Sequence, residues 1–185
     1  TILSKYLSEV NQLTNNIVVS TVMSNYGFKQ AIEKFNFDLI ETPVGDKYVA
    51  EAMKKYDAAL GGEQSGHIII SDQLPVGDGL VTLIYVLKAM QHFGVALSDF
   101  KKENLYEYPQ QLTNLELKNK LNDEELEYIN QIALDMSIKK DLDGRYLIRN
   151  SGTEPLLRVL VEAKSNEAME DFSNELITKI NKYLN

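Results

Sequence analysis

The chain has 185 residues, 44% of them hydrophobic and 25% charged, with ten glycines and four prolines. This composition is typical of a folded chain and excludes a low-complexity or disordered one. The formal net charge of −8 at pH 7 repels anionic surfaces, so we expect neither nucleic acid nor a membrane as a partner. With no cysteine and only two histidines, the chain has neither a disulfide framework nor a cysteine- or histidine-rich metal site.

The start of the chain and the length of its apolar runs indicate where in the cell we expect the protein. No stretch has the pattern of a signal peptide, and no apolar run approaches the length of a membrane span, so we expect a cytoplasmic protein. The chain starts without methionine inside a helical pattern that includes Ile2 and Leu7. We therefore expect N-terminal domains of the same protein to precede it.

The first half of the chain alternates short apolar strands with helices. That alternation predicts an α/β/α-type domain with a mostly parallel sheet. On its last helix, apolar residues recur every three or four positions, so we expect them to face the core. The expected strands are residues 17–19, 37–40, 58–60 and 67–70, the helices are residues 2–13, 24–35, 46–56 and 79–93, and the inward residues of the last helix are Leu80, Leu83, Ile84, Leu87 and Met90.

The second half has a different pattern. Three predicted strands and two helices indicate a small α+β domain with an antiparallel sheet and two helices. A charged, tyrosine-rich stretch at residues 101–109 separates the two patterns, so we predict domains at residues 1–104 and 105–185. The expected strands are residues 112–117, 146–148 and 156–161, and the helices are residues 122–133 and 166–184.

The strongest candidate site is Arg-Asn-Ser-Gly-Thr-Glu-Pro at residues 149–155, followed by Arg158. A phosphate group prefers such a set, because arginine offers a planar pair of donors, hydroxyls donate, and glycine lets backbone N–H groups approach closely. The alternative is an ordinary β-turn in which Arg149 pairs with Glu154. The residue types alone leave both interpretations open.

The second candidate is Gly-Gly-Glu-Gln-Ser-Gly-His at residues 61–67. Its glycines free the backbone, and its polar side chains supply acceptors and donors for sugar hydroxyls. Ser65 does not fit the G-x-S-x-G pattern of a hydrolase nucleophile. The alternative is a polar loop without a ligand.

Two weaker patterns favour turns and caps over binding sites. The acidic residues 141–145 end in Gly-Arg before a strand, which is typical of a turn, so we expect no metal site there. Asp78 between two glycines is expected to cap the helix that follows.

The two strong loops, taken together and in this order, resemble those of the α-D-phosphohexomutase superfamily, most closely its bacterial phosphoglucosamine mutase branch. The resemblance extends along the chain and includes residues 18–25, 44–49 and 77–80. Superfamily members have four domains. The resemblance implies that this chain supplies the third, which binds sugar, and the fourth, which binds phosphate.

The resemblance also implies an activity for the whole protein. The whole protein would be an isomerase that interconverts glucosamine 6-phosphate and glucosamine 1-phosphate through a phosphoserine and a bisphosphate intermediate, for synthesis of the cell-wall precursor UDP-N-acetylglucosamine. The phosphoserine and the magnesium ligands would lie outside this chain, a glucose or glucosamine 1,6-bisphosphate would act as activator, and the chain alone would be inactive. No catalytic residue is implied here, whereas Glu63, Gln64, Ser65 and His67 would bind the sugar and Arg149, Ser151, Gly152, Thr153 and Arg158 the phosphate.

Two residues depart from the superfamily pattern. Asn150 stands where proline or alanine is usual, so we expect a looser turn. Lys47 stands where arginine is common. Two alternative functions stay open: a phosphomannomutase or phosphoglucomutase of the same superfamily, and a sugar-phosphate-binding module without catalysis.

Overall fold

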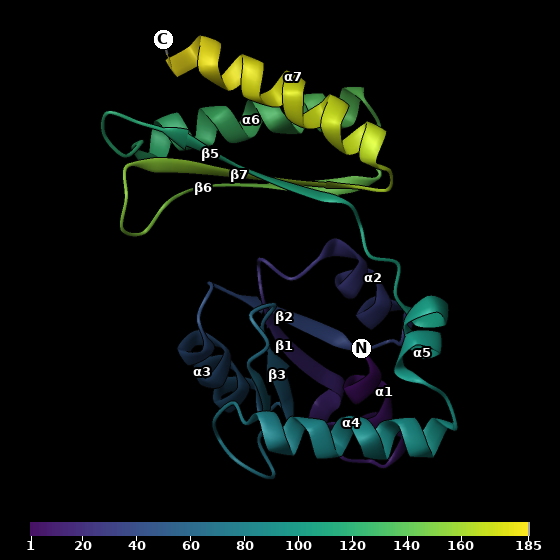
Figure 1. Cartoon of the computed structure of the whole chain (residues 1–185). Helices are drawn as coiled ribbons and strands as arrows, with labels where there is room; N and C mark the ends of the chain where they lie inside the picture. Colours follow the sequence, from purple (N-terminus) through teal and green to yellow (C-terminus); the bar gives the residue numbers. More distant parts are fainter. Residues whose placement is uncertain (185) are drawn as a thin grey trace. The chain divides into compact units, whose positions relative to one another are not determined.

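The computed structural model describes residues 1–184, which belong to two compact units, Thr1–Glu107 and Tyr108–Asn185. Figure 1 labels most of their helices and strands. The first unit contains α1 (Ile2–Glu9), the 3-10 turn η1 (Thr14–Asn16), β1 (Ile17–Thr21), α2 (Tyr26–Lys34), β2 (Asp38–Thr42), α3 (Asp46–Tyr56), β3 (Leu60–Gly62), β4 (Ile68–Ile70), α4 (Gly79–Phe93) and α5 (Leu97–Asn104). The second contains β5 (Gln110–Glu116), α6 (Asp123–Lys139), β6 (Gly144–Asn150), β7 (Leu156–Ala163) and α7 (Asn166–Leu184).

The first unit is built on a four-stranded sheet in the order β2-β1-β3-β4. β1 runs parallel to β2 and β3, and only β4 is antiparallel to its neighbour. Successive residues of a strand face opposite sides, so Val18 packs with α1, α2, α4 and α5 while Val19 packs with α3. Both faces of the sheet are therefore covered by helices, which confirms the predicted α/β/α layers and the mostly parallel sheet.

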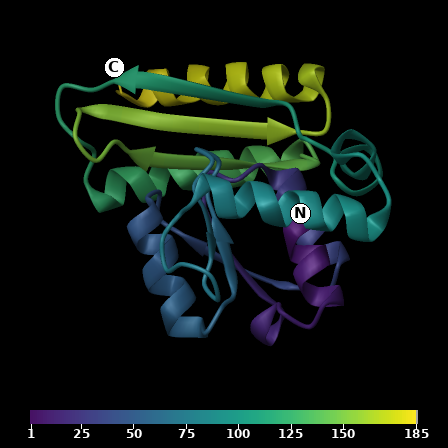
Figure 2. The same cartoon turned by 60° about the horizontal axis from the view of Figure 1, so that its bottom comes forward.

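The second unit is an antiparallel sheet with two helices on one face. β7 lies between β5 and β6 (Figure 2), and both pairings are antiparallel. Residues of β7 that alternate along the strand, such as Leu157 and Val159, are fully buried against Phe172 and Leu176 of α7 and Ile129 of α6. The predicted α+β class is confirmed. The opposite face of the sheet carries Arg149 and Arg158 together with leucines such as the buried Leu160.

The structure corrects the expected orientation of α4. Leu80, Leu83, Ile84 and Leu87 are 74, 52, 51 and 54% exposed, whereas Tyr85 and Ala89 are buried in the core. Of the five expected inward residues only Met90 packs against that core. The prediction was wrong because α4 is apolar on both sides, and a repeat of three or four positions does not say which side meets the sheet.

The sequence pattern also missed α5. This helix has only eight residues and a single buried one, Phe100, so its periodicity is too short to detect. Within residues 1–184, no single helix is long and apolar enough to cross a membrane. In the described part of the chain, only the pair α4 and α5, bent by 74° at their junction, meets that test by length and composition.

The α4 correction predicts a contrast between two isoleucines of the first unit. Ile84→Ala removes an exposed side chain and should change the free energy of unfolding by about 0.5 kcal/mol or less. Ile32→Ala makes the same change at a fully buried position and should cost about 2–5 kcal/mol. Chemical denaturation of the two variants measures the difference, and equal losses would show that the exposed side of α4 is packed.

Candidate functional site

The sugar-site candidate is the turn that joins β3 to β4. The Gly66 N–H donates to the Glu63 carbonyl at 3.0 Å, and the Glu63 N–H donates to the His67 carbonyl at 3.0 Å. Gly66 has a φ of 97°, a conformation that other residues rarely adopt. The glycine therefore closes a tight turn that holds the residues between Glu63 and His67 together.

Three of the four predicted sugar-site side chains contact one another. The Ser65 hydroxyl donates to Glu63 Oε1 at 2.8 Å and lies 2.9 Å from His67 Nδ1, which is also 2.9 Å from Glu63 Oε1. Because Ser65 and Glu63 meet the same ring nitrogen, His67 cannot pass a proton between them as the histidine of a hydrolase triad does. The cluster instead fixes the Glu63 carboxylate, whose second oxygen has no partner within residues 1–184.

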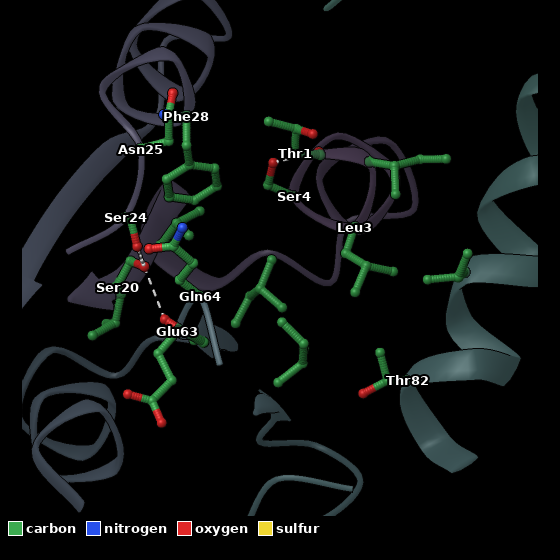
Figure 3. A pocket seen from close by; sticks show the side chains of 18 of the residues that line it. Thr1, Leu3, Ser4, Ser20, Ser24, Asn25, Phe28, Glu63, Gln64 and Thr82 are labelled. Atoms are coloured by element: carbon green, nitrogen blue, oxygen red, sulfur yellow. Dashed lines mark hydrogen bonds between the residues drawn. The ribbon is translucent and has the colours of Figure 1, made fainter. Parts of the chain in front are cut away.

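Beside this turn lies a pocket of about 380 Å³, lined by residues of α1, β1, α2, β3 and α4. Most of the lining is apolar, but Ser20, Ser24 and Gln64 lie together along one side of it (Figure 3). The buried Ser20 hydroxyl donates to the Gly62 carbonyl at 2.8 Å and lies 2.5 Å from the Ser24 hydroxyl. It thereby fixes the residue that precedes Glu63.

Sequence reasoning did not select Ser20 or Ser24, although one signal was present. β1 and β3 are parallel, so their carboxyl ends lie at the same edge of the sheet, where ligands of open α/β sheets usually bind. Ser20 and Glu63 each sit at that edge. Polar residues at the end of an apolar strand are the pattern that could have found them.

The phosphate-site candidate joins β6 to β7. Arg149 and Arg158 stand directly opposite one another in the β6–β7 pairing. Their neighbours Ile148 and Val159 face the helices, so both arginines lie on the other face of the sheet. The strand register therefore brings the two predicted guanidinium groups together.

The charge of Arg149 is not balanced by a carboxylate of the described residues. Within residues 1–184, Arg149 has no carboxylate at ion-pair distance, and Arg158 reaches only Glu154, at 3.9 Å. Burial and then the positive charge of Arg158 lower the pKa of Arg149. Like charges directly opposite in a sheet are destabilising. The alternative in which Arg149 pairs with Glu154 is wrong, and an anion between the arginines would relieve their repulsion.

The turn itself adds donors that have no acceptor. The hydroxyl of Ser151 is buried without a hydrogen-bond partner. Within the described residues, the backbone N–H groups of Gly152, Thr153 and Glu154 also lack an acceptor. A buried hydroxyl such as that of Ser151 is normally paired. The three N–H groups belong to exposed residues, and successive free N–H groups form concavities that bind anions. The predicted phosphate-site residues therefore form one group of donors and positive charges.

The acidic turn before β6 has a structural role. The Asp143 carboxylate accepts from Lys164 at 2.9 Å and from the Tyr108 hydroxyl at 3.1 Å. The bond from Lys164 lowers the pKa of Asp143. Among residues 1–184, no three histidine, aspartate or glutamate side chains lie close enough together to hold a metal ion.

Comparison with known families decides where the chain belongs. Residues 1–108 match the alpha/beta/alpha domain III of phosphoglucomutase/phosphomannomutase, and residues 112–179 match its C-terminal domain. The chain belongs to the phosphoglucomutase/phosphomannomutase family. The predicted superfamily resemblance is confirmed.

Curated members of this family are much longer than the chain. It is 46% identical over 171 residues to the phosphoglucosamine mutase of Streptococcus agalactiae, a match that covers 91% of this chain and 38% of that protein. It is 42% identical over 176 residues to the phosphoglucosamine mutase of Bacillus subtilis, covering 95% and 39%. The chain therefore spans about two fifths of the length of these relatives.

Solved structures support the fold. The N-acetylphosphoglucosamine mutase of Aspergillus fumigatus aligns with a TM-score of 0.82 and 18% identity, covering 99% of this chain and 42% of that chain. An N-acetylglucosamine-phosphate mutase of the α-D-phosphohexomutase superfamily, solved as a substrate complex, aligns with a TM-score of 0.75 and 20% identity, covering 97% and 41%. Both units of this family member thus have counterparts in one longer chain.

The unpartnered hydroxyl of Ser151 predicts an unusual stability effect. Ser151→Ala removes a buried polar atom that makes no hydrogen bond, so the free energy of unfolding should stay the same or rise by up to about 1 kcal/mol. Ser20→Ala is the control, because its equally buried hydroxyl makes two bonds and its loss should cost about 1–3 kcal/mol. Thermal and chemical unfolding report both values. A clear loss of stability in Ser151→Ala would show that the hydroxyl has a partner in solution.

Proposed function

We propose that this chain is the sugar- and phosphate-binding half of a phosphoglucosamine mutase, a cytoplasmic isomerase that interconverts glucosamine 6-phosphate and glucosamine 1-phosphate. The observation that carries the proposal is the donor group around Arg149 and Arg158, which has two positive charges and free N–H groups. Within residues 1–184 the only carboxylate at ion-pair distance is that of Glu154, 3.9 Å from Arg158. The identity to bacterial phosphoglucosamine mutases supports the choice of substrate.

The residues of this chain bind and orient the substrate. Arg149, Ser151, Gly152, Thr153 and Arg158 hold the phosphate group that is not being transferred, and Glu63, Ser65, Gln64 and His67 hold sugar hydroxyls. Rigid binding of the non-reacting groups lowers the entropy cost of reaching the transition state. The phosphoserine, a magnesium ion and their ligands belong to the preceding domains, and magnesium supplies charge neutralisation at the transferred phosphate. The chain alone therefore has no turnover.

The chief alternative is a phosphomannomutase or phosphoglucomutase, which the family description itself favours. The longer enzyme separates these functions when glucosamine, mannose and glucose 6-phosphates are compared as substrates, with a hexose 1,6-bisphosphate as activator. Preference for the glucosamine phosphate supports the proposal. A chain that binds these phosphates, and whose longer protein converts none of them, would be a binding module without catalysis.

Arg149→Lys tests the phosphate site. Lysine keeps the charge but loses the planar pair of donors, so binding of glucosamine 6-phosphate or inorganic phosphate should weaken by about 1–3 kcal/mol. The melting temperature should barely change, because the Arg149 side chain contributes no ion pair to the fold. Calorimetric titration compares the variant with the unaltered chain and with Lys118→Met, an exposed change in the same unit. Equal affinity of all three proteins would reject a phosphate contact.

Glu63→Ala tests the sugar site in the longer enzyme. Loss of a carboxylate that accepts from a sugar hydroxyl should lower kcat/KM by about tenfold to a hundredfold. Glu51→Ala on α3 is the control, because that exposed carboxylate reaches only Lys47, at 3.9 Å. Steady-state kinetics and thermal unfolding are measured for both variants. If Glu63→Ala keeps full activity, Glu63 does not contact the sugar.

A further inference from the structure

A segment of the second unit lies along the phosphate turn and is bonded to it at several points. We call residues 117–122, between β5 and α6, the support segment. Its last residue, Asn122, is fixed at the start of α6 by a reciprocal pair of hydrogen bonds with Glu125, 2.8 and 2.9 Å long. Its first residue, Leu117, donates its N–H to the Pro155 carbonyl at 2.9 Å. The support segment is thus anchored at both ends.

Asn150 bonds the support segment at the first residue of the turn. Its side-chain carbonyl accepts from the Leu121 N–H at 3.2 Å, and its amide nitrogen donates to the Leu121 carbonyl at 2.9 Å. The Asn150 side chain thereby pairs both the N–H and the C=O of Leu121. These two bonds restrain the start of the turn without the ring of a proline, and the looser turn expected at Asn150 stays a prediction.

Lys120 bonds the middle of the turn. Its Nζ donates to the Gly152 carbonyl at 2.6 Å. The peptide that follows Gly152 is trans, so its C=O and its N–H, which belongs to Thr153, point in opposite directions. A bond that fixes the Gly152 carbonyl therefore also fixes the direction of the Thr153 N–H, and a charged donor on the carbonyl makes that N–H a stronger donor.

We propose that Lys120 and Asn150 are positioning residues of the anion site. They hold the turn so that the free N–H groups of Gly152 and Thr153 point to one place before any ligand arrives. The inference rests on the proposed function of the turn as a phosphate site, and it assigns to the support segment the task of orienting the turn's donors. Lys120 acts on the side of the Gly152–Thr153 peptide away from the ligand, so its role is orientation rather than direct charge pairing.

The chain provides a matched control for the charge of Lys120. Lys118 is an exposed lysine of the same support segment and has no hydrogen bond or ion pair within residues 1–184. Lys120→Met and Lys118→Met each remove one positive charge at nearly the same place, and only Lys120→Met removes the bond to Gly152. Lys120→Arg keeps a charged donor at the position.

The experiment titrates inorganic phosphate into the whole chain and follows the backbone amide signals of the turn by NMR. Lys120→Met should raise the dissociation constant about threefold to tenfold, the worth of one hydrogen bond, while Lys118→Met and Lys120→Arg stay within about twofold. Before phosphate is added, Lys120→Met should already shift the Thr153 amide signal, which a purely charge-based role would not do. Asn150→Ala should shift the same signals, and the melting temperature of Lys120→Met should not change.

Two different failures are distinguishable. If the unaltered chain shows no phosphate-dependent shift in the turn, the proposed function fails and this inference fails with it. If the unaltered chain binds phosphate and Lys120→Met binds equally well, the phosphate site stands and the positioning role is overturned. Equal weakening by Lys118→Met and Lys120→Met would also overturn it, because that result needs only the net charge.

Discussion

The phosphate-site candidate of the second unit depends on the opposition of Arg149 and Arg158, two positive charges that the β6–β7 pairing holds together. Their place is set by residues that are not charged: Ile148 and Val159 are buried against the helices, so the next residue on each strand must face the other way. A slip of the register by one residue would bury an arginine and expose the core. The hydrophobic core therefore enforces an arrangement that electrostatics alone would oppose.

The first unit places its polar groups by a similar constraint. Its sheet is covered on both faces, so polar side chains are confined to the strand ends, where Ser20 bonds the Gly62 carbonyl. Gly61 shows how tight the layer is, because a side chain there would collide with Val49 and Met53 of α3. The glycines before Glu63 thus serve close packing at Gly61 as well as the freedom of the turn.

The two sheets and the two candidate loops could be predicted from the sequence, because each depends on residues that are close together in the chain. Strand alternation gave both sheets, and both candidate loops stood out because glycine and polar residues cluster between apolar runs. The predictions that failed concern contacts between segments that are far apart in the sequence. The apolar pattern of α4 could not say that Ala89, rather than Leu87, faces the core. The bonds of Lys120 and Asn150 join residues about thirty positions apart, and nothing in either segment points to the other.

The pattern of paired and unpaired polar groups marks the phosphate-site candidate even in a structure without ligand. A protein that only needed stability would pair a buried donor such as the Ser151 hydroxyl, because an unpaired one costs about 1–3 kcal/mol. In the phosphate turn the pairing is selective: carbonyl groups on one side are bonded by Lys120 and by the Leu117 N–H, while the N–H groups of Gly152 and Thr153 are left free. The Ser151 N–H is bonded to the Leu156 carbonyl at 2.7 Å, so within residues 1–184 the free donors of the turn are the Ser151 hydroxyl and the N–H groups of Gly152, Thr153 and Glu154. We expect selective pairing of this kind in a turn that binds an anion, and not in one that only reverses the direction of the chain.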